Sequence, residues 1–149
     1  MMFSFDLVTC PNHSHKELKT MTQLYKTVLY DHHVGLGGQM VEFAGWELPL
    51  HYAPGIVQEH LATRKGSGIF DVSHMGEIWI KGPHAKELVQ RITSNDVALL
   101  EPGKIQYSCL PNDQGGIVDD LLVYMYDNNK FLLVVNASNQ EKDHKWIIR

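Results

Sequence analysis

Residues 115–136, with the sequence GGIVDDLLVYMYDNNKFLLVVN, decide the fold that we expect for this chain of 149 residues. Two runs rich in β-branched and aromatic residues, 117–126 and 131–136, are split by the polar triplet 127–129. This pattern predicts a β-hairpin with a short turn. In a three-residue loop the last residue takes the left-handed conformation, which asparagine tolerates, so we expect that conformation at Asn129.

Side-chain alternation along the first strand separates a core face from a polar face. One face is apolar after its first residue: Asp119, Leu121, Val123 and Met125. The opposite face mixes an acid with two phenols: Asp120, Leu122, Tyr124 and Tyr126. The first face suits a core, and we expect the second to form the floor of a site with Asp120 as its central polar group.

The loop length determines which residues pair across the hairpin. A three-residue loop pairs Asp120 with Asn136, at a Cβ separation of about 5 Å, so that both flank one pocket. The same loop gives three further pairs: Tyr126 with Lys130, Tyr124 with Leu132, and Leu122 with Val134. A five-residue loop shifts the partners by two, and a four-residue loop places Asp120 against the wrong face. In the plainer alternative, the two aspartates end a turn and Asn136 caps a helix that begins near Ala137.

The remaining chain mixes helices and strands. We expect helices at 16–30, at 54–65 and from Pro83 onward, strands at 39–43, 69–72, 77–81 and 105–110, and a turn or loop with Trp46 at 44–49. This order predicts an α+β fold with a mixed, mainly antiparallel sheet and flanking helices.

Composition excludes several classes of protein. The net charge is −4 and no basic run appears, which argues against a nucleic-acid binder. No apolar run is long enough for a membrane span. The cysteines, Cys10 and Cys109, form no disulfide framework and fit a reducing compartment. We expect a cytoplasmic protein, or one of the mitochondrial matrix in a eukaryote, although no clear transit peptide is seen.

The other groups of polar and ionisable residues do not predict a catalytic triad or a metal site. Asp71, Ser73 and His74 are too close in sequence for a nucleophile–base–acid triad, and we expect a hydrogen-bonded turn there. His32 and His33 would face about 100° apart on a helix, which makes them poor joint metal ligands. We therefore expect no metal site.

Several segments resemble, in order and spacing, the N-terminal part of the aminomethyltransferase (T-protein) family of the glycine cleavage system. The most specific are GIFDVSHM at 68–75 and GGIVDDL at 115–121. The others are MVEFAGW at 40–46, TSNDV at 93–97, VVNA at 134–137 and EKD at 141–143. Together the segments cover residues 27–149.

The resemblance implies a transferase of one-carbon metabolism that acts in glycine catabolism. Members of this family take an aminomethyl group from the dihydrolipoyl arm of the carrier H-protein. Tetrahydrofolate accepts the carbon, and ammonia is released. The implied partners are therefore tetrahydrofolate and the lipoyl-bearing H-protein, with no metal, nucleic acid or membrane.

The resemblance also implies roles for individual residues. Asp120 takes the place of the family's catalytic acid, which contacts the pterin, and Asn136 matches the asparagine beside it. An ionised carboxylate there would stabilise the positive charge that develops during carbon transfer to a folate nitrogen. The other implied folate contacts are Met75, Trp79, Tyr107, Leu122, Tyr124 and Val134.

Family members are much longer, and their later segments complete the folate site. We therefore expect residues 27–149 to be a truncated folate-binding region with weak folate binding and no turnover by itself. Residues 1–26 have no family counterpart, and we expect a disordered or helical extension. Two alternatives stay open: the folate domain of a sarcosine or dimethylglycine dehydrogenase-like enzyme, and a non-enzymatic folate-binding module like the related iron–sulfur assembly factors.

Overall fold

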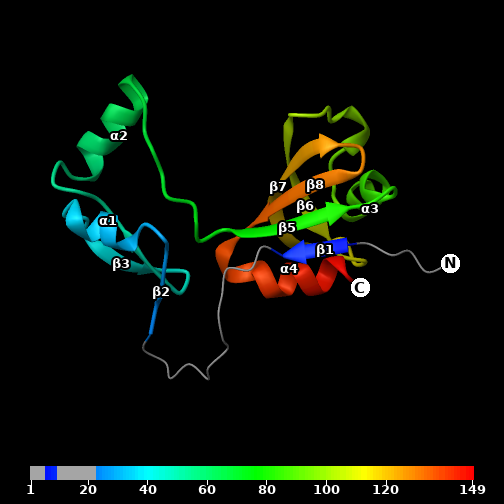
Figure 1. Cartoon of the computed structure of the whole chain (residues 1–149), viewed down its shortest axis with the longest axis horizontal. Helices are drawn as coiled ribbons and strands as arrows, with labels where there is room; N and C mark the ends of the chain where they lie inside the picture. Colours follow the sequence, from blue (N-terminus) through cyan, green and yellow to red (C-terminus); the bar gives the residue numbers. More distant parts are fainter. Residues whose placement is uncertain (1–5, 10–22) are drawn as a thin grey trace. The chain divides into compact units, whose positions relative to one another are not determined.

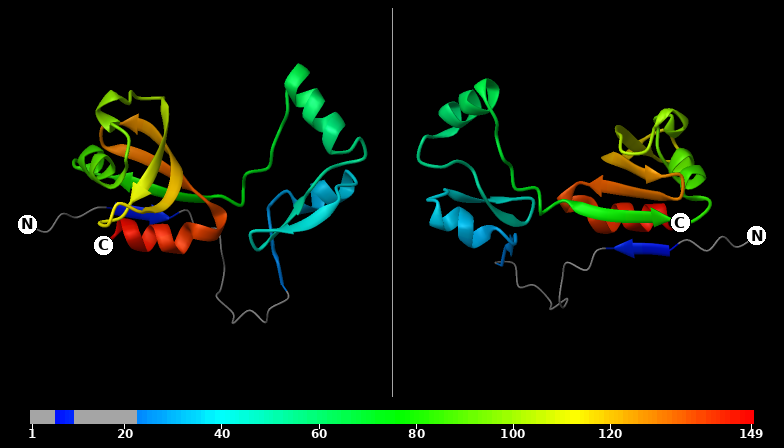
Figure 2. Two further views of the ribbon diagram at one scale, coloured as in Figure 1. Left: turned by 180° about the vertical axis from the view of Figure 1, so that it is seen from behind. Right: turned by 45° about the horizontal axis from the view of Figure 1, so that its top comes forward.

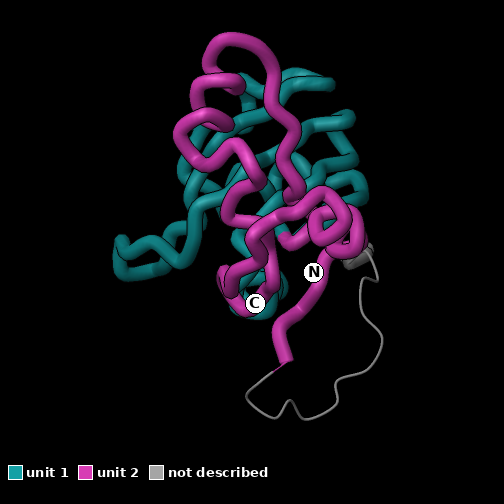
Figure 3. Tube along the Cα trace, turned by 90° about the vertical axis from the view of Figure 1, so that its left-hand side faces the viewer, with its two compact units in different colours: residues 1–14, 75–149 teal, residues 15–74 magenta. Residues whose placement is uncertain are grey.

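The structure, a computed structural model, describes residues 6–9 and 23–149. The chain divides into two compact units, coloured separately in Figure 3. Unit 1 consists of Met1–Ser14 and Met75–Arg149, and unit 2 of His15–His74. The expected single region 27–149 is thus divided at residue 75.

Unit 1 is built on a five-stranded sheet with the order β1-β5-β8-β7-β6, in which every neighbouring pair is antiparallel (Figure 1). The strands are β1 (Asp6–Thr9), β5 (Gly76–Lys81), β6 (Ile105–Pro111), β7 (Ile117–Asp127) and β8 (Lys130–Val135). The helices are α3 (Ala85–Ile92), α4 (Gln140–Ile147) and the short 3-10 turns η1 (Val97–Leu99) and η2 (Ala137–Asn139). We expected a disordered or helical extension over 1–26, but Asp6–Thr9 form a strand on β5; the rest of 1–22 lies outside the described residues.

The predicted hairpin is present as β7 and β8, with one difference at its turn. Leu122 pairs with Val134, as the sequence predicted. Lys130, however, pairs with Asp127 and not with Tyr126, because a bulge between Met125 and Asp127 adds one residue to β7. The connection is therefore the two residues 128–129, and the left-handed conformation expected at Asn129 is absent. The bulge offsets the shorter loop, so the faces of the strands remain as predicted.

The core of unit 1 lies between one face of this sheet and the helices. Phe131, Leu133 and Val123 are fully buried at its centre. Helix α3 adds Ala85 and Val89, which recur at the four-residue spacing of a helix face. Helix α4 runs beside the sheet (Figure 2), and its Ile147 completes the cluster. The predicted core face of β7 is confirmed, since Leu121, Val123 and Met125 are all buried.

Unit 2 contains a smaller sheet with the order β2-β4-β3, in which β2 and β4 are parallel. Its elements are β2 (Tyr25–Lys26), α1 (Tyr30–Gly35), β3 (Met40–Phe43), β4 (Trp46–Pro49) and α2 (Ile56–Lys65). The predicted strand at 39–43 and helix at 54–65 are confirmed within two residues. The α+β class with mainly antiparallel sheets is also confirmed.

Three predictions for unit 2 are wrong. The helix expected at 16–30 is replaced, in its described part, by β2, because pairing with β4 outweighs the local helical spacing. The loop expected at 44–49 is a two-residue turn at Ala44 and Gly45, both at positive φ, followed by a strand. The strand expected at 69–72 is not formed, since these residues pair with no strand among the described residues, and Ile69 is fully exposed. Among the described residues, no helix is long and apolar enough to cross a membrane.

Candidate functional site

The face of the unit 1 sheet opposite the core carries most of the residues that the resemblance singled out. Leu122 at the centre of β7 pairs with Val134 on one side and with Tyr107 on the other. Tyr124 forms the next row with its partner Leu132. Leu122, Tyr124 and Val134 are half-buried, and Tyr107 is exposed. Apolar and aromatic side chains thus form an open platform suited to a flat ring system.

Asp120 lies at the end of this platform, and both of its carboxylate oxygens accept hydrogen bonds. The Tyr107 hydroxyl donates to Oδ2 at 2.9 Å, and the Asn136 side-chain amide donates to Oδ1 at 3.0 Å. The same amide nitrogen lies 3.1 Å from the Asp120 backbone oxygen. These bonds hold an exposed carboxylate in one orientation at the edge of the aromatic surface.

The hydrogen bond between Tyr107 and Asp120 also acts on the phenol. It raises the pKa of Tyr107 above its ordinary value, because ionisation would lose the bond and place two negative charges together. Tyr107 therefore stays a donor to the carboxylate throughout the neutral range.

Asn136 does not cap a helix through its side chain, so the plainer alternative for this residue is wrong. It occupies the N-cap position of η2, but its side chain makes no capping bond. Its amide instead bridges the two adjacent aspartates, with Asp119 Oδ1 at 3.0 Å. Both aspartates lie within β7 and do not end a turn.

Asp119 points to the opposite side of β7 and is buried. Its Oδ1 also accepts from the Asn139 amide at 2.9 Å. Burial alone would raise the pKa of Asp119, but hydrogen bonds from Asp143, Asn136 and Asn139 outweigh it and lower the pKa. Asp119 is thus an ionised carboxylate beneath the candidate site.

Two other implied contacts come from β5 and from the residue before it. Trp79 on β5 pairs with Leu132, and its ring lies 5.1 Å from the Tyr126 ring, near the ammonium group of Lys130. Met75 is half-buried and directly precedes β5. The hydrogen bonds of the Asp120 carboxylate go to Tyr107 and Asn136, and to neither of these side chains.

Unit 2 contains a separate buried polar cluster around Asp71. His33 Nε2 lies 2.9 Å from Asp71 Oδ2, and the Thr27 hydroxyl donates to the same oxygen at 2.7 Å. The other ring nitrogen of His33 contacts the Tyr52 hydroxyl at 2.6 Å. The Ser73 backbone N–H donates to Asp71 Oδ1 at 2.9 Å, which forms the expected hydrogen-bonded turn. Sequence reasoning missed the cluster because its members come from four separate segments.

The cluster predicts how acid affects unit 2. Burial would raise the pKa of Asp71, but bonds from Ser73, His33 and Thr27 lower it well below its usual range. A lowered folded-state pKa contributes stability above about pH 4 that is lost as the pH falls further. Asp71→Asn should therefore destabilise unit 2 by about 1–3 kcal/mol at neutral pH, and the difference from wild type should shrink in acid.

Urea unfolding followed by the NMR signal of the Trp46 indole measures this effect in unit 2. Asp31→Asn, at an exposed acid, is the matched control and should change little. A difference that stays constant down to about pH 2 would contradict the assignment.

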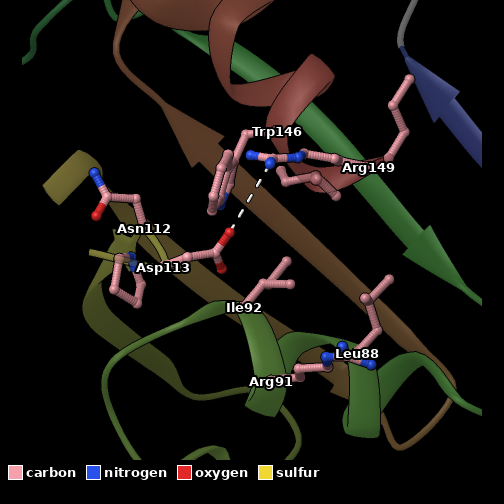
Figure 4. A pocket seen from close by; sticks show the side chains of 10 residues that line it. Leu88, Arg91, Ile92, Asn112, Asp113, Trp146 and Arg149 are labelled. Carbon is pink, nitrogen blue, oxygen red and sulfur yellow. Dashed lines mark ion pairs between the residues drawn. The ribbon is translucent and has the colours of Figure 1, made fainter. Parts of the chain in front are cut away.

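A pocket of about 830 Å³ lies elsewhere on unit 1, between α3, α4 and residues 111–113 (Figure 4). Arg149 spans it, with its guanidinium 3.9 Å from Asp113 and 5.0 Å from the Trp146 ring centre. Both ionic side chains are largely exposed, so the pair contributes little stability. None of the predicted site residues lines this pocket. No cluster of three metal-ligating side chains occurs within 6–9 and 23–149.

Comparison with known proteins supports the resemblance. The model of the GCVT N-terminal domain matches residues 29–149. An aminomethyltransferase of Bacteroides fragilis is 60% identical over 122 residues, which cover 82% of this chain and 34% of the relative. An aminomethyltransferase of Desulforamulus reducens is 54% identical over 128 residues, 86% of this chain and 35% of the relative.

A solved structure agrees. The crystal structure of glycine cleavage system aminomethyltransferase T from Bartonella henselae superposes with a TM-score of 0.80 at 40% identity, over 85% of this chain and 35% of that one. The fold and these similarities place the chain in the class of α+β N-terminal domains of T-proteins. The chain belongs to the GCVT N-terminal domain family. It spans about a third of the length of the curated relatives that it matches.

Proposed function

We propose that this chain carries the Asp120 wall of the folate site of a tetrahydrofolate-dependent aminomethyltransferase of the glycine cleavage system. The observation that carries the proposal is the Asp120 carboxylate, held by Tyr107 and Asn136 at the end of an apolar and aromatic surface. In the proposed reaction, the one-carbon unit passes from the aminomethyl-dihydrolipoyl arm of H-protein to tetrahydrofolate, and ammonia is released.

The chemistry of the acid fits this reaction. A folate nitrogen that attacks an activated carbon gains positive charge, and a fixed carboxylate lowers the energy of that charge. Asp120 is already oriented by two hydrogen bonds, so little reorganisation is needed when the charge develops. We assign Asp120 the catalytic role and leave the proton transfer to be measured.

The platform beside the acid fits the ligand. A pterin is flat and apolar on its faces and has polar edges, so it needs apolar walls with few polar anchors. Leu122, Tyr124 and Val134 offer the walls, and Asp120 and Asn136 offer the anchors. Met75, Trp79 and Tyr107 are proposed as further contacts, with residues 27–149 as the folate-binding region and the cytoplasm as its location.

A chimera tests the function in a full-length enzyme. Residues 29–149 of this chain would replace the matching region of the Bacteroides fragilis aminomethyltransferase, to which the chain is 60% identical. With H-protein and tetrahydrofolate, we expect turnover comparable to that of the parent enzyme. A folded chimera that binds H-protein and yet forms no methylenetetrahydrofolate would contradict the proposal.

A further inference from the structure

A second acid, Asp143 on α4, lies behind the candidate site. Its side chain is fully buried, with an exposed fraction of 0%. Neither of its carboxyl oxygens has a hydrogen-bond donor among the described residues, and the same holds for Asp119 Oδ2. Asp143 interacts with Asp119. If both carboxyl groups were ionised, two buried negative charges would face each other with no hydrogen-bond donor between them.

A proton on Asp143 resolves this conflict. The pKa of Asp143 is raised to about 7. Burial is the largest cause, followed by the hydrogen bond with Asp119 and the negative charge of Asp119. Asp120 acts in the same direction, and only Lys142 opposes the shift. The protonated carboxyl group of Asp143 can then donate to Asp119, which remains ionised.

The contact continues to the candidate site through one amide. Asp119 Oδ1 accepts from Asn136 Nδ2 at 3.0 Å, and the same nitrogen donates to Asp120 Oδ1 at 3.0 Å. Tyr107 completes the series on the other oxygen of Asp120. Asp119 and Asp120 thus both accept from the same side-chain amide.

We propose that Asp143 is a positioning residue, whose protonated carboxyl group donates a hydrogen bond to Asp119 and thereby fixes the Asn136 amide against the Asp120 carboxylate. Loss of that proton places two anions in contact in the interior, which weakens the support of Asn136. The catalytic importance of Asp120 rests on the proposed function. The series of contacts from Asp143 through Asp119 and Asn136 to Asp120 does not depend on that function.

NMR of the 149-residue chain tests the proposal with two variants. Asp143→Asn keeps a donor toward Asp119 and removes the titration, whereas Asp143→Leu removes both. In wild type we expect the Asn136 side-chain amide signals to shift with a midpoint at about pH 7. In Asp143→Asn this step should vanish while the amide signals keep their low-pH positions, and in Asp143→Leu they should move at every pH.

Stability gives a second readout. The pKa of Asp143 is raised on folding, so its favourable contribution is complete below about pH 4 and is lost as the pH rises to its folded value. The melting temperature of Asp143→Asn should therefore rise relative to wild type across this interval and stay higher above it. Asp113→Asn, at an exposed acid, is the matched control and should keep the wild-type step.

The proposal is overturned if Asp143→Asn retains the same step near neutral pH, or if a folded Asp143→Leu leaves the Asn136 amide signals unchanged. These readouts need no folate. If the NMR results were as expected but the chimera were inactive, the proposed function would be refuted. The role of Asp143 would remain.

Discussion

Replacing Asp120 by asparagine in the chimera should lower turnover roughly 100- to 1,000-fold while the fold remains intact. The amide has nearly the same shape, and its oxygen can still accept from Asn136 while its nitrogen donates to the Tyr107 hydroxyl. Only the negative charge is lost, and that charge is what would stabilise the transition state. Turnover near the wild-type value would show that Asp120 is not the catalytic acid.

Kinetic parameters separate two roles of the acid. If Asp120 acts on charge that develops during transfer, kcat falls and KM for tetrahydrofolate changes little. If it only binds the folate, KM rises and kcat is retained. Asp127→Asn lies on the same strand and is exposed, so it is the matched control and should leave both parameters unchanged.

The largest effect on stability is expected for Phe131→Ala. Phe131 has an exposed fraction of 0% and lies on β8, paired with Ile80 on one side and Met125 on the other. Truncating a buried phenylalanine costs about 3–5 kcal/mol, because its apolar area is lost and a cavity remains. For a small unit this loss is comparable to the whole free energy of unfolding.

Urea unfolding followed by the NMR signal of the Trp79 indole, which lies in unit 1, measures this loss. Ile117→Ala on the neighbouring strand is the control, since Ile117 is 60% exposed and should lose less than about 1 kcal/mol. A loss of similar size in both variants would show that the core of unit 1 has been misplaced.

The hairpin could be predicted from the sequence because its signals were local. Period-two alternation separated Leu121, Val123 and Met125 from the Asp120 face, and all three are buried. The bulge near Tyr126 could not be predicted, since nothing in the triplet 127–129 distinguishes a three-residue loop from a two-residue loop with a bulge. Both choices keep the same faces, so the two faces of β7 were predicted correctly although the turn was not.

Other features depended on contacts distant in sequence. Tyr25 and Lys26 form a strand only because β4 lies beside them, and Ala44 adopts a positive φ that its residue type does not indicate. The role of Asp143 was also missed, although one signal existed. Asp119 fell on an otherwise apolar face, and a buried acid needs a polar partner from elsewhere in the chain.

The proposed contact between folate and the Asp120 face of the β7–β8 hairpin can be measured by chemical-shift mapping. A stable reduced folate would be titrated into the isotope-labelled 149-residue chain, because NMR detects the weak binding that we expect. We expect little change at the buried Val123 and Leu133. The largest shifts should fall on the residues of the folate-facing surface: Tyr107, Leu122, Tyr124, Val134 and the Asn136 side chain. Shifts confined to unit 2 or to the pocket around Trp146 would contradict it.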